Sequence, residues 1–497
     1  MTGTPVRIGL ALLSHTNAGK TTLARTLLRR DIGAVMDRPH VTEVAESHVL
    51  LATSSGDELV LWDTPGFGDS VRLLRRLEHS DRPVGWFLSQ VWDRLADRPF
   101  WCSQQAMRAA RDAADVLLYV ANATEQPRAA GYVEPELRIL RWLGKPTLVL
   151  LNQLGTRSDP EREAATERLW RELLRAEIPG PAHEVLAFDA FARCWVQEHV
   201  LLEAIAAVLD PAQAAGWSRL RAEWARRDRD VLAASARVIA DQWHRLAQDR
   251  ETVPAATLPD KLRQVARSVG AAADTAVSPA EERARRTLLQ RLDAAVRSST
   301  GELVRLHGLD GGASEQILAQ LGSEFATERA PDPDRAGLLG GLVSGALGGL
   351  AADLAAGGLT LGAGAVIGGV AGALGARKLT QLYNAERGLD GSVVRWSEEF
   401  LRARLEAALV RYLAVAHYGR GRGEFRDAPP DPRWAESVRA TLAARGIDVA
   451  TAWQAAAADP AMHDDTLAVT VEALLLDTLR RLYPRAVAAL DAAGRPV

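Results

Sequence analysis

The feature that most constrains this chain is the run Ser14-His15-Thr16-Asn17-Ala18-Gly19-Lys20-Thr21. It follows a short apolar stretch, residues 6–13, and precedes a stretch with helical character, residues 20–28. In a strand–loop–helix context, backbone N–H groups face anionic phosphates, a lysine adds a compact positive charge, and a threonine hydroxyl binds Mg²⁺. The run therefore predicts a phosphate-binding loop.

The predicted nucleotide-binding set in this loop is Asn17, Ala18, Gly19, Lys20, Thr21 and Thr22. Ser14 occupies a position where glycine is usual, and a chance Gly-Lys-Thr at a helix start is the alternative interpretation. The chain otherwise uses arginine almost throughout, with lysine only at positions 20, 145, 261 and 378. A lysine kept at position 20 favours the phosphate role, because a guanidinium fork would not replace a point charge.

A second motif, Asp63-Thr64-Pro65-Gly66, ends the apolar stretch 58–62. Asp63 at a strand end beside the phosphate loop is expected to hold Mg²⁺ through water, and the Gly66 amide to contact the γ-phosphate. An isolated Asp-Thr-Pro-Gly would be an ordinary turn. Its distance from Gly-Lys-Thr favours the nucleotide site.

Together, residues 16–23 and this second motif resemble the Era-like and TrmE-like branch of the translation-factor class of P-loop GTPases, over about residues 5–210. The resemblance implies GTP and GDP as ligands and catalytic roles for Lys20, Thr42 and Gly66. It also implies Mg²⁺ held by Thr21, Thr42 and Asp63, although Thr42 could instead be a surface loop residue. In TrmE-like members the residue matching Asn17 helps to bind K⁺, which makes K⁺ a candidate cofactor. Phe67 stands where many members have a water-orienting glutamine, so we expect slow intrinsic turnover.

Guanine recognition is the weakest part of the resemblance. The family motif Asn-Lys-x-Asp is matched here by Asn152-Gln153-Leu154-Gly155, in which only the asparagine agrees. We expect Asn152 and Gln153 to contact the nucleotide. The next strand ends before Asp189 and Ala190, where Ala190 resembles the residue whose N–H contacts the base. Asp189 is a candidate replacement for the missing carboxylate.

Alternation of apolar strands and helices predicts an α/β domain with a mostly parallel sheet over residues 1–210, with a helical insertion at about 70–112. Expected strands are residues 6–13, 48–53, 58–62, 116–121, 147–151 and 184–188. The rest is predicted to be all-α: a helical domain at 211–330, a Gly/Ala-rich hairpin at 336–378 and a C-terminal helical domain at 379–497. The insertion holds Trp86, Phe87, Trp92, Phe100 and Trp101, which form either a docking surface for an unknown protein or internal packing.

Residues 336–376 contain one ionisable residue, Asp353, and two glycine stripes with a four-residue period. Such stripes let helices pack closely, in a membrane or in a protein core. Flanking Arg335, Arg377 and Lys378 place both ends on the cytoplasmic side. We interpret this segment as a membrane-associating hairpin, with self-association or a buried core as the alternative.

Composition narrows the function further. A net charge of −3 and a pI near 6.4 give no strong nucleic-acid signal. Two cysteines exclude a disulfide framework and fit a reducing compartment, so we expect a cytoplasmic protein at the inner face of the membrane.

The chain resembles a bacterial group in which an Era-like GTPase domain is fused to a C-terminal helical domain of unknown function, of the 3482 type. The predicted function is GTP hydrolysis coupled to a helical, membrane-associating module. A nucleotide-gated scaffold with little hydrolysis, or a dynamin-like membrane-remodelling protein, is the alternative.

Overall fold

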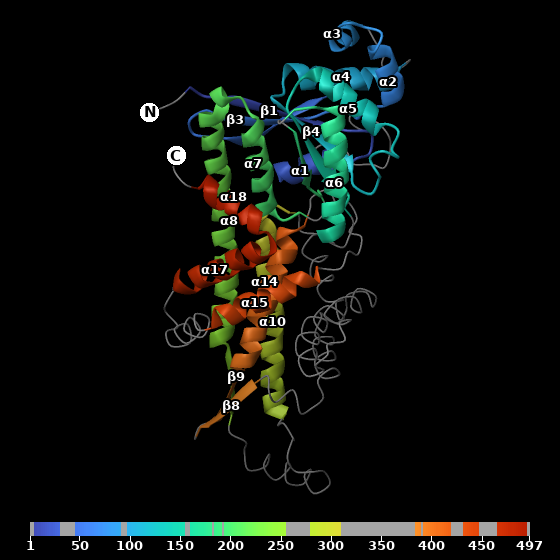
Figure 1. The fold of residues 1–497 in the computed structure, drawn as a ribbon. Helices are drawn as coiled ribbons and strands as arrows, with labels where there is room; N and C mark the ends of the chain where they lie inside the picture. The colour runs from blue at the N-terminus through green and yellow to red at the C-terminus, as the bar shows by residue number, and fades with distance from the viewer. Residues whose placement is uncertain are drawn as a thin grey trace. The chain divides into compact units, whose positions relative to one another are not determined.

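The structure is a computed structural model of the 497-residue chain, shown in Figure 1. It describes residues 4–29, 45–90, 97–154, 160–180, 183–190, 193–254, 279–309, 383–388, 391–418, 431–446 and 465–494. The chain divides into two compact units. The first unit comprises residues 1–230, 416–431 and 479–497, and the second unit comprises residues 231–415 and 432–478.

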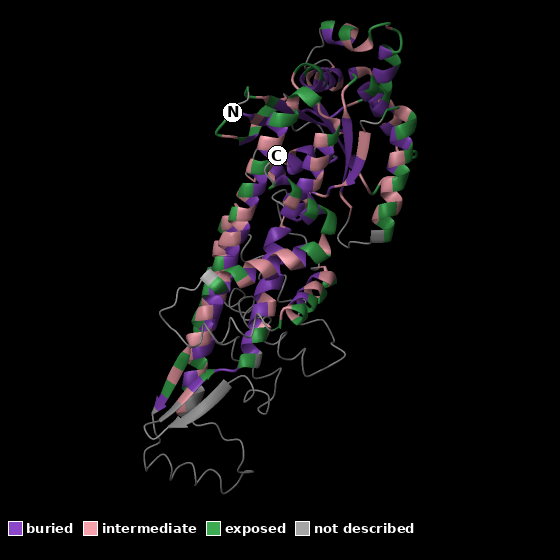
Figure 2. Ribbon diagram, turned by 60° about the vertical axis from the view of Figure 1, so that its left-hand side comes forward, coloured by how far each residue is buried: buried purple, intermediate pink, exposed green. Residues whose placement is uncertain are grey.

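A six-stranded sheet forms the centre of the first unit, in the order β2-β3-β1-β4-β5-β6. Neighbouring strands are parallel except β2, which pairs antiparallel with β3 at one edge. All six predicted strands form: β1 (Arg7–Leu13), β2 (Glu46–Ala52), β3 (Glu58–Asp63), β4 (Val116–Asn122), β5 (Thr147–Asn152) and β6 (His183–Ala187). The central strands β1, β4 and β5 are buried almost throughout, as expected for parallel strands covered on both faces (Figure 2).

Two hydrophobic clusters cover the two faces of this sheet. Successive residues of β1 alternate between them: Leu10 and Leu12 belong to one cluster, Ala11 and Leu13 to the other. The first cluster includes residues of α1 (Lys20–Leu28), α7 (Glu198–Val208) and the start of α8 (Ala214–Gln248). The second includes residues of α2 (Ser70–Leu77), α3 (Pro83–Ser89), α4 (Arg98–Asp112), α5 (Val133–Leu143) and α6 (Pro160–Glu177). Short 3-10 turns, η1 (Trp195–Gln197) and η2 (Pro211–Gln213), flank α7.

The predicted insertion is helical and comprises α2, α3 and α4. Phe87 and Phe100 are fully buried, with their rings 6.2 Å apart edge to face. These two aromatics therefore pack internally, while Trp92 lies outside the described residues. Packing inside the unit, not docking, accounts for the buried pair.

The C-terminal helix α18 (Pro484–Ala493) belongs to the first unit, although residues 188–483 lie between it and β6 along the chain. Its Ala486, Val487 and Leu490 are buried, and it packs on α7. The sequence pattern predicts this helix within the C-terminal helical domain, residues 379–497, whereas in the structure it packs in the first unit.

The second unit is helical, as predicted. It contains the C-terminal half of α8 together with α10 (Pro279–Leu306), α15 (Pro432–Ala444) and all but the last residues of α14 (Glu398–Ala416) and α17 (Asp465–Leu482). The prediction missed a small antiparallel sheet, β7-β9-β8, formed by β7 (Arg250–Pro254), β8 (Tyr383–Gly388) and β9 (Gly391–Trp396). β8 and β9 form a hairpin with only residues 389 and 390 between them, whereas β7 lies more than a hundred residues earlier, and the strands lack a regular alternation. Val253, Val394 and Trp396 become strand-like only by packing against α10 and α14.

Several predicted features lie outside the described residues: Thr42, Gly155 and the hairpin at 336–378. Of the helices that the structure does describe, none is both long enough and apolar enough to cross a membrane.

Candidate nucleotide-binding site

The loop between β1 and α1 has the backbone of a phosphate cradle. Asn17 and Gly19 adopt left-handed conformations, with φ of 67° and 90°. A Cβ at Gly19 would lie 2.4 Å from Asn152 Nδ2, so glycine is required for both conformation and space. The loop thereby reaches α1 with its amides at the N-terminus of that helix, which favours anion binding.

Lys20 is buried, and its Nζ donates a hydrogen bond to Ser14 Oγ at 2.8 Å. Ser14, the departure from the usual glycine, therefore holds the lysine head group in place. Burial lowers the pKa of Lys20, while the negative charges of Asp63 and Glu136 oppose that shift. A buried lysine of this kind is placed to receive a phosphate.

Thr21 and Asp63 come together as the sequence predicted. Thr21 Oγ1 donates to Asp63 Oδ2 at 2.8 Å, and Asp63 is only 3% exposed. Asp63 Oδ1 is buried without a hydrogen-bond partner, and burial raises the pKa of this carboxyl. A hydroxyl and a carboxylate with a free buried oxygen are the hard oxygen ligands that Mg²⁺ prefers, so these residues fit that ion.

Gly66 and Phe67 lie in contact with the phosphate loop. A Cβ at Gly66 would lie 3.0 Å from Thr16 Cα and 3.2 Å from Lys20 Nζ. Phe67 N–H donates to the Ser14 carbonyl at 2.9 Å, and Thr16 Oγ1 donates to the Phe67 carbonyl at 3.0 Å. The Phe67 ring is fully buried in the core, so it does not orient water.

The base-binding candidates lie beside the same loop. Asn152 Nδ2 donates to the Ala18 carbonyl at 2.9 Å, and its Oδ1 accepts from the Ala190 N–H, also at 2.9 Å. Asn152 therefore ties the phosphate loop to the final loop of the sheet, a role that the sequence did not reveal. Asp189 Oδ2 accepts from the Leu154 N–H at 2.8 Å, next to the non-matching motif. Gln153 Nε2 lies 3.4 Å from the Asn17 carbonyl.

Sequence reasoning missed Glu136, a fully buried carboxylate on α5. It accepts from Ser70 Oγ at 2.6 Å and from Tyr119 OH at 2.8 Å, and its Oε1 lies 2.8 Å from His15 Nδ1. The glutamate thus joins the phosphate loop to the start of α2. The only available signal was a carboxylate at helical spacing from Val133, Leu137 and Leu140.

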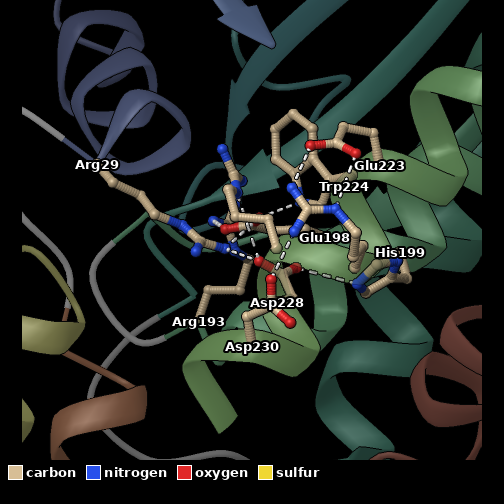
Figure 3. Close-up of polar contacts among 10 residues, drawn as sticks. Arg29, Arg193, Glu198, His199, Glu223, Trp224, Asp228 and Asp230 are labelled. Carbon is tan, nitrogen blue, oxygen red and sulfur yellow. Dashed lines mark hydrogen bonds and ion pairs between the residues drawn. The ribbon is translucent and has the colours of Figure 1, made fainter. Parts of the chain in front are cut away.

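A second missed cluster ties the end of α1 to α7 and α8 (Figure 3). Arg29 donates to Asp228 Oδ1 at 2.7 Å and to Glu198 Oε2 at 3.1 Å. Arg193 donates to Glu198 Oε1 at 2.7 Å, Trp224 Nε1 donates to Glu198 Oε2 at 2.9 Å, and His199 Nε2 lies 3.1 Å from Asp228 Oδ2. Arg29, the C-cap residue of α1, is therefore anchored to α7 and α8.

Comparison with known families agrees with this geometry. Residues 182–475, more than half of the chain, match the model described as Domain of unknown function (DUF3482). The chain belongs to the DUF3482 family. Residues 10–153 of this DUF3482 protein match the model described as 50S ribosome-binding GTPase. The phosphate cradle thus belongs to a P-loop GTPase domain, and the predicted resemblance is confirmed.

Solved structures are similar at low identity. A variant of Era from Aquifex aeolicus bound to GDP and AlF4⁻ has 14% identity and a TM-score of 0.28, covering 61% of this chain and 99% of that one. A complex of SsGBP with GDP has 17% identity and a TM-score of 0.27, covering 42% of this chain and about half, 52%, of that one. A bacterial dynamin pair has 10% identity and a TM-score of 0.25, covering 98% and 77%. No curated protein sequence matches the chain. TM-scores this low carry no argument about function.

Proposed function

We propose that this DUF3482 protein binds Mg²⁺–GTP in the cradle, hydrolyses it to GDP and phosphate, and uses the nucleotide state to act on its helical second unit. The observation that carries the proposal is the Thr21–Asp63 pair, 2.8 Å apart, with a partnerless buried carboxylate oxygen beside the buried Lys20. This arrangement supplies the charge and the oxygen ligands that a triphosphate and its metal require.

The chemistry would rest on positioning and charge. Lys20 and the loop amides bind the β- and γ-phosphates, and Gly66 N–H faces the γ-phosphate. Thr21, Asp63 and Thr42 would hold Mg²⁺, which would neutralise phosphate charge. Water attacks the γ-phosphorus, the bond to the β,γ-bridging oxygen breaks, and GDP leaves with that oxygen. Because Phe67 has no polar group that could orient the attacking water, intrinsic turnover is slow.

Measured phosphate release from GTP tests the core of this proposal. Lys20→Ala should reduce release at least about 100-fold, because it removes a charge that stabilises the transition state. Arg7→Ala is a matched control, since Arg7 is 65% exposed at the start of the same strand. Equal release by Lys20→Ala and wild type would refute hydrolysis in this cradle. Negligible release by the wild type, with intact GTP binding, would favour the nucleotide-gated scaffold.

Asn17 is proposed as a K⁺ ligand that aids turnover. It lies in the loop with a left-handed backbone, next to the residues that bind phosphate. Hydrolysis should be faster in K⁺ than in Na⁺ at equal ionic strength, and Asn17→Ala should abolish that difference. Equal wild-type rates in the two salts would remove K⁺ from the mechanism.

Asp189 is proposed to contribute base selectivity in place of the carboxylate that position 155 lacks. Its hydrogen bond to the Leu154 N–H supports this, because it sets the carboxylate against the non-matching motif. Affinities for GTP, ATP and xanthosine triphosphate should differ between wild type and Asp189→Ala. Unchanged selectivity would exclude the role.

Membrane association is the remaining element of the proposal. It is supported by the composition of residues 336–376 and by their flanking basic residues. Full-length protein should float with liposomes, and a variant lacking residues 336–376 should not. We expect the inner face of the cytoplasmic membrane to be the location, with self-association or a protein partner acting on turnover. Liposome-stimulated hydrolysis would favour the membrane-remodelling alternative.

A further inference from the structure

Two arginines of α14 are buried inside the second unit. Arg404 is 8% exposed and Arg411 is 5% exposed. They are separated by about two helical turns, so they lie on the same face of the helix. Arginine is among the residue types that are rarely buried unless paired with an acid. Two of them on one buried face therefore need an explanation.

Arg411 is held in place by neutral groups from two other helices. Its Nη2 donates to Gln242 Oε1 of α8 at 2.7 Å and to Ser299 Oγ of α10 at 3.0 Å. Ser299 Oγ in turn donates to Gln242 Oε1 at 3.0 Å. These contacts fix the orientation of the guanidinium group but do not neutralise its charge. Arg411 Nε has no hydrogen-bond partner.

Arg404 presents an open fork. Its Nε and Nη2 are both buried without a partner, and together they form the edge that grips carboxylate or phosphate with two parallel hydrogen bonds. Its guanidinium carbon lies 5.3 Å from the centre of the Phe400 ring, which orients the group. The nearby Glu406 is ion-paired with Arg439 at 3.4 Å.

Both groups keep their charge. Burial lowers the pKa of Arg404 and of Arg411 to about 10, and the charge of Arg404 further lowers that of Arg411. Both values remain well above neutral pH. No described carboxylate forms an ion pair with either residue, and the charge of Glu406 only partly opposes the lowering of the pKa of Arg404. Burying a charge without an ion-pair partner is costly.

We propose that Arg404 and Arg411 form a binding site for a phosphate group, carried by a soluble molecule or by a lipid headgroup. The free donors are the two on the Arg404 edge and Nε of Arg411, and the two side chains are close enough for the charge of Arg404 to act on Arg411. Three donors and two positive charges match a tetrahedral oxyanion with three accepting oxygens and a charge near −2. A single carboxylate has one charge and two oxygens. The site is separate from the nucleotide cradle and does not depend on the proposed GTPase mechanism.

Calorimetric titration with inorganic phosphate tests this site on the full chain. The protein is saturated with Mg²⁺–GDP, to occupy the nucleotide cradle, and ionic strength is held constant. Wild type should bind phosphate saturably, and Arg404→Met and Arg411→Met should each bind at least about tenfold more weakly. Arg404→Lys, which keeps the charge but loses the fork, should fall between them and wild type. Arg402→Met is the matched control, because Arg402 lies on the same helix but is 57% exposed and pairs with Glu398.

A second arm separates the two sources of phosphate. Phosphatidylcholine vesicles with and without phosphatidic acid are sedimented with wild type and Arg404→Met. Arg404-dependent binding to phosphatidic acid, without binding of inorganic phosphate, assigns the lipid source. Titration by inorganic phosphate alone assigns the soluble source. If neither probe shows binding that Arg404→Met or Arg404→Lys weakens, the proposal is wrong and the pair is only an uncompensated buried charge.

Discussion

The two units treat buried arginines in opposite ways. In the first unit, the buried Arg193 and the partly buried Arg29, which is 21% exposed, contact two buried carboxylates, Glu198 and Asp228. In the second, the buried Arg404 and Arg411 form no ion pair with a described carboxylate: Arg411 donates to Gln242 and Ser299, and Arg404 lies over the Phe400 ring. The same side chain therefore serves two purposes. Where the chain supplies the counter-charge, the arginine fixes the fold, and where it does not, the site is available to an external anion.

In the first-unit cluster each arginine has a carboxylate partner, although Nε and Nη1 of Arg193 are buried without a hydrogen-bond partner. Although burial alone would raise the pKa of Asp228, the charge of Arg29 and the His199 hydrogen bond lower it overall. Glu198 accepts hydrogen bonds from Arg29, Arg193 and Trp224. Because Arg29 directly follows the helix that begins at the phosphate loop, this cluster holds the nucleotide site against α8.

The largest expected effect comes from breaking that compensation. Asp228→Asn removes the buried carboxylate that His199 contacts and one of the two that Arg29 contacts, and it should lower the free energy of unfolding by about 3–5 kcal/mol. Urea denaturation measures it, using the transition that Mg²⁺–GDP shifts to higher urea, because ligand binding identifies the nucleotide-binding unit. Asp230→Asn is the control: Asp230 is 63% exposed, and its loss should cost under about 1 kcal/mol. A similar small loss for Asp228→Asn would mean that the cluster does not support the fold.

The same arginine-to-methionine substitution should change the free energy of unfolding in opposite directions in the two units. Arg193→Met removes a partner of the buried Glu198 and should cost about 2–3 kcal/mol. Arg404→Met removes a charge that lacks a partner and should raise the unfolding free energy of the second unit by about 1–3 kcal/mol in anion-free buffer. Denaturation of both variants with and without Mg²⁺–GDP separates the two transitions. Destabilisation by both would erase the contrast between the units.

The sequence was a good guide wherever local pattern decides structure. Six strands, the phosphate loop and the Thr21–Asp63 pair were predicted, because strand periodicity and motif spacing depend on near neighbours. The charged clusters were not predicted, since Arg29 meets its partners 169 and 199 residues further along the chain. Asn152 was assigned to the base, but its ties to Ala18 and Ala190 depend on how three loops meet. In the sheet β7-β9-β8, the pairing of β7 with β9 is long-range in the same way, whereas the hairpin β8–β9 is local and was missed because its strands lack a regular alternation.

Asp57 in the first unit is intermediate between the buried and the exposed ion pairs, because its carboxylate is buried and its arginine partner is partly exposed. This buried carboxylate accepts two hydrogen bonds from Arg219, at 2.6 and 2.7 Å, and Arg219 lowers its pKa to about 2. A lowered folded-state pKa gives stability that is present above the unfolded value, near 4, and is lost as pH falls towards 2. Because Arg219 is 30% exposed, solvent screens the pair, and we expect about 1–2 kcal/mol at pH 7.

Asp57→Asn should therefore be less stable than wild type at pH 7, and the difference should shrink between pH 4 and pH 2. Urea denaturation across that range measures it. Asp112→Asn is the control, because Asp112 pairs with Arg111 at 2.6 Å but is 48% exposed, so its loss should have almost no effect. If the stability difference between Asp57→Asn and wild type does not change with pH, the hydrogen bonds of Asp57, not its charge, stabilise the turn between β2 and β3.

The smallest expected effect is at the exposed end of the scale. Arg485 on α18 lies 3.3 Å from Glu184 and 3.7 Å from Glu203, yet its side chain is 58% exposed. Arg485→Ala should change the unfolding free energy by less than about 0.5 kcal/mol, and the change should disappear in high salt. The same denaturation measurement, made at low and at high salt, checks this. A cost above about 1 kcal/mol would mean that the number of ion-pair partners matters more than burial. Arg485 is exposed and has two ion-pair partners, whereas Arg193 is buried and has one. If burial determines how much an ion pair stabilises, Arg485 must contribute far less than Arg193. If it does not, the contrast between Arg193 and Arg404 reflects only the number of ion-pair partners.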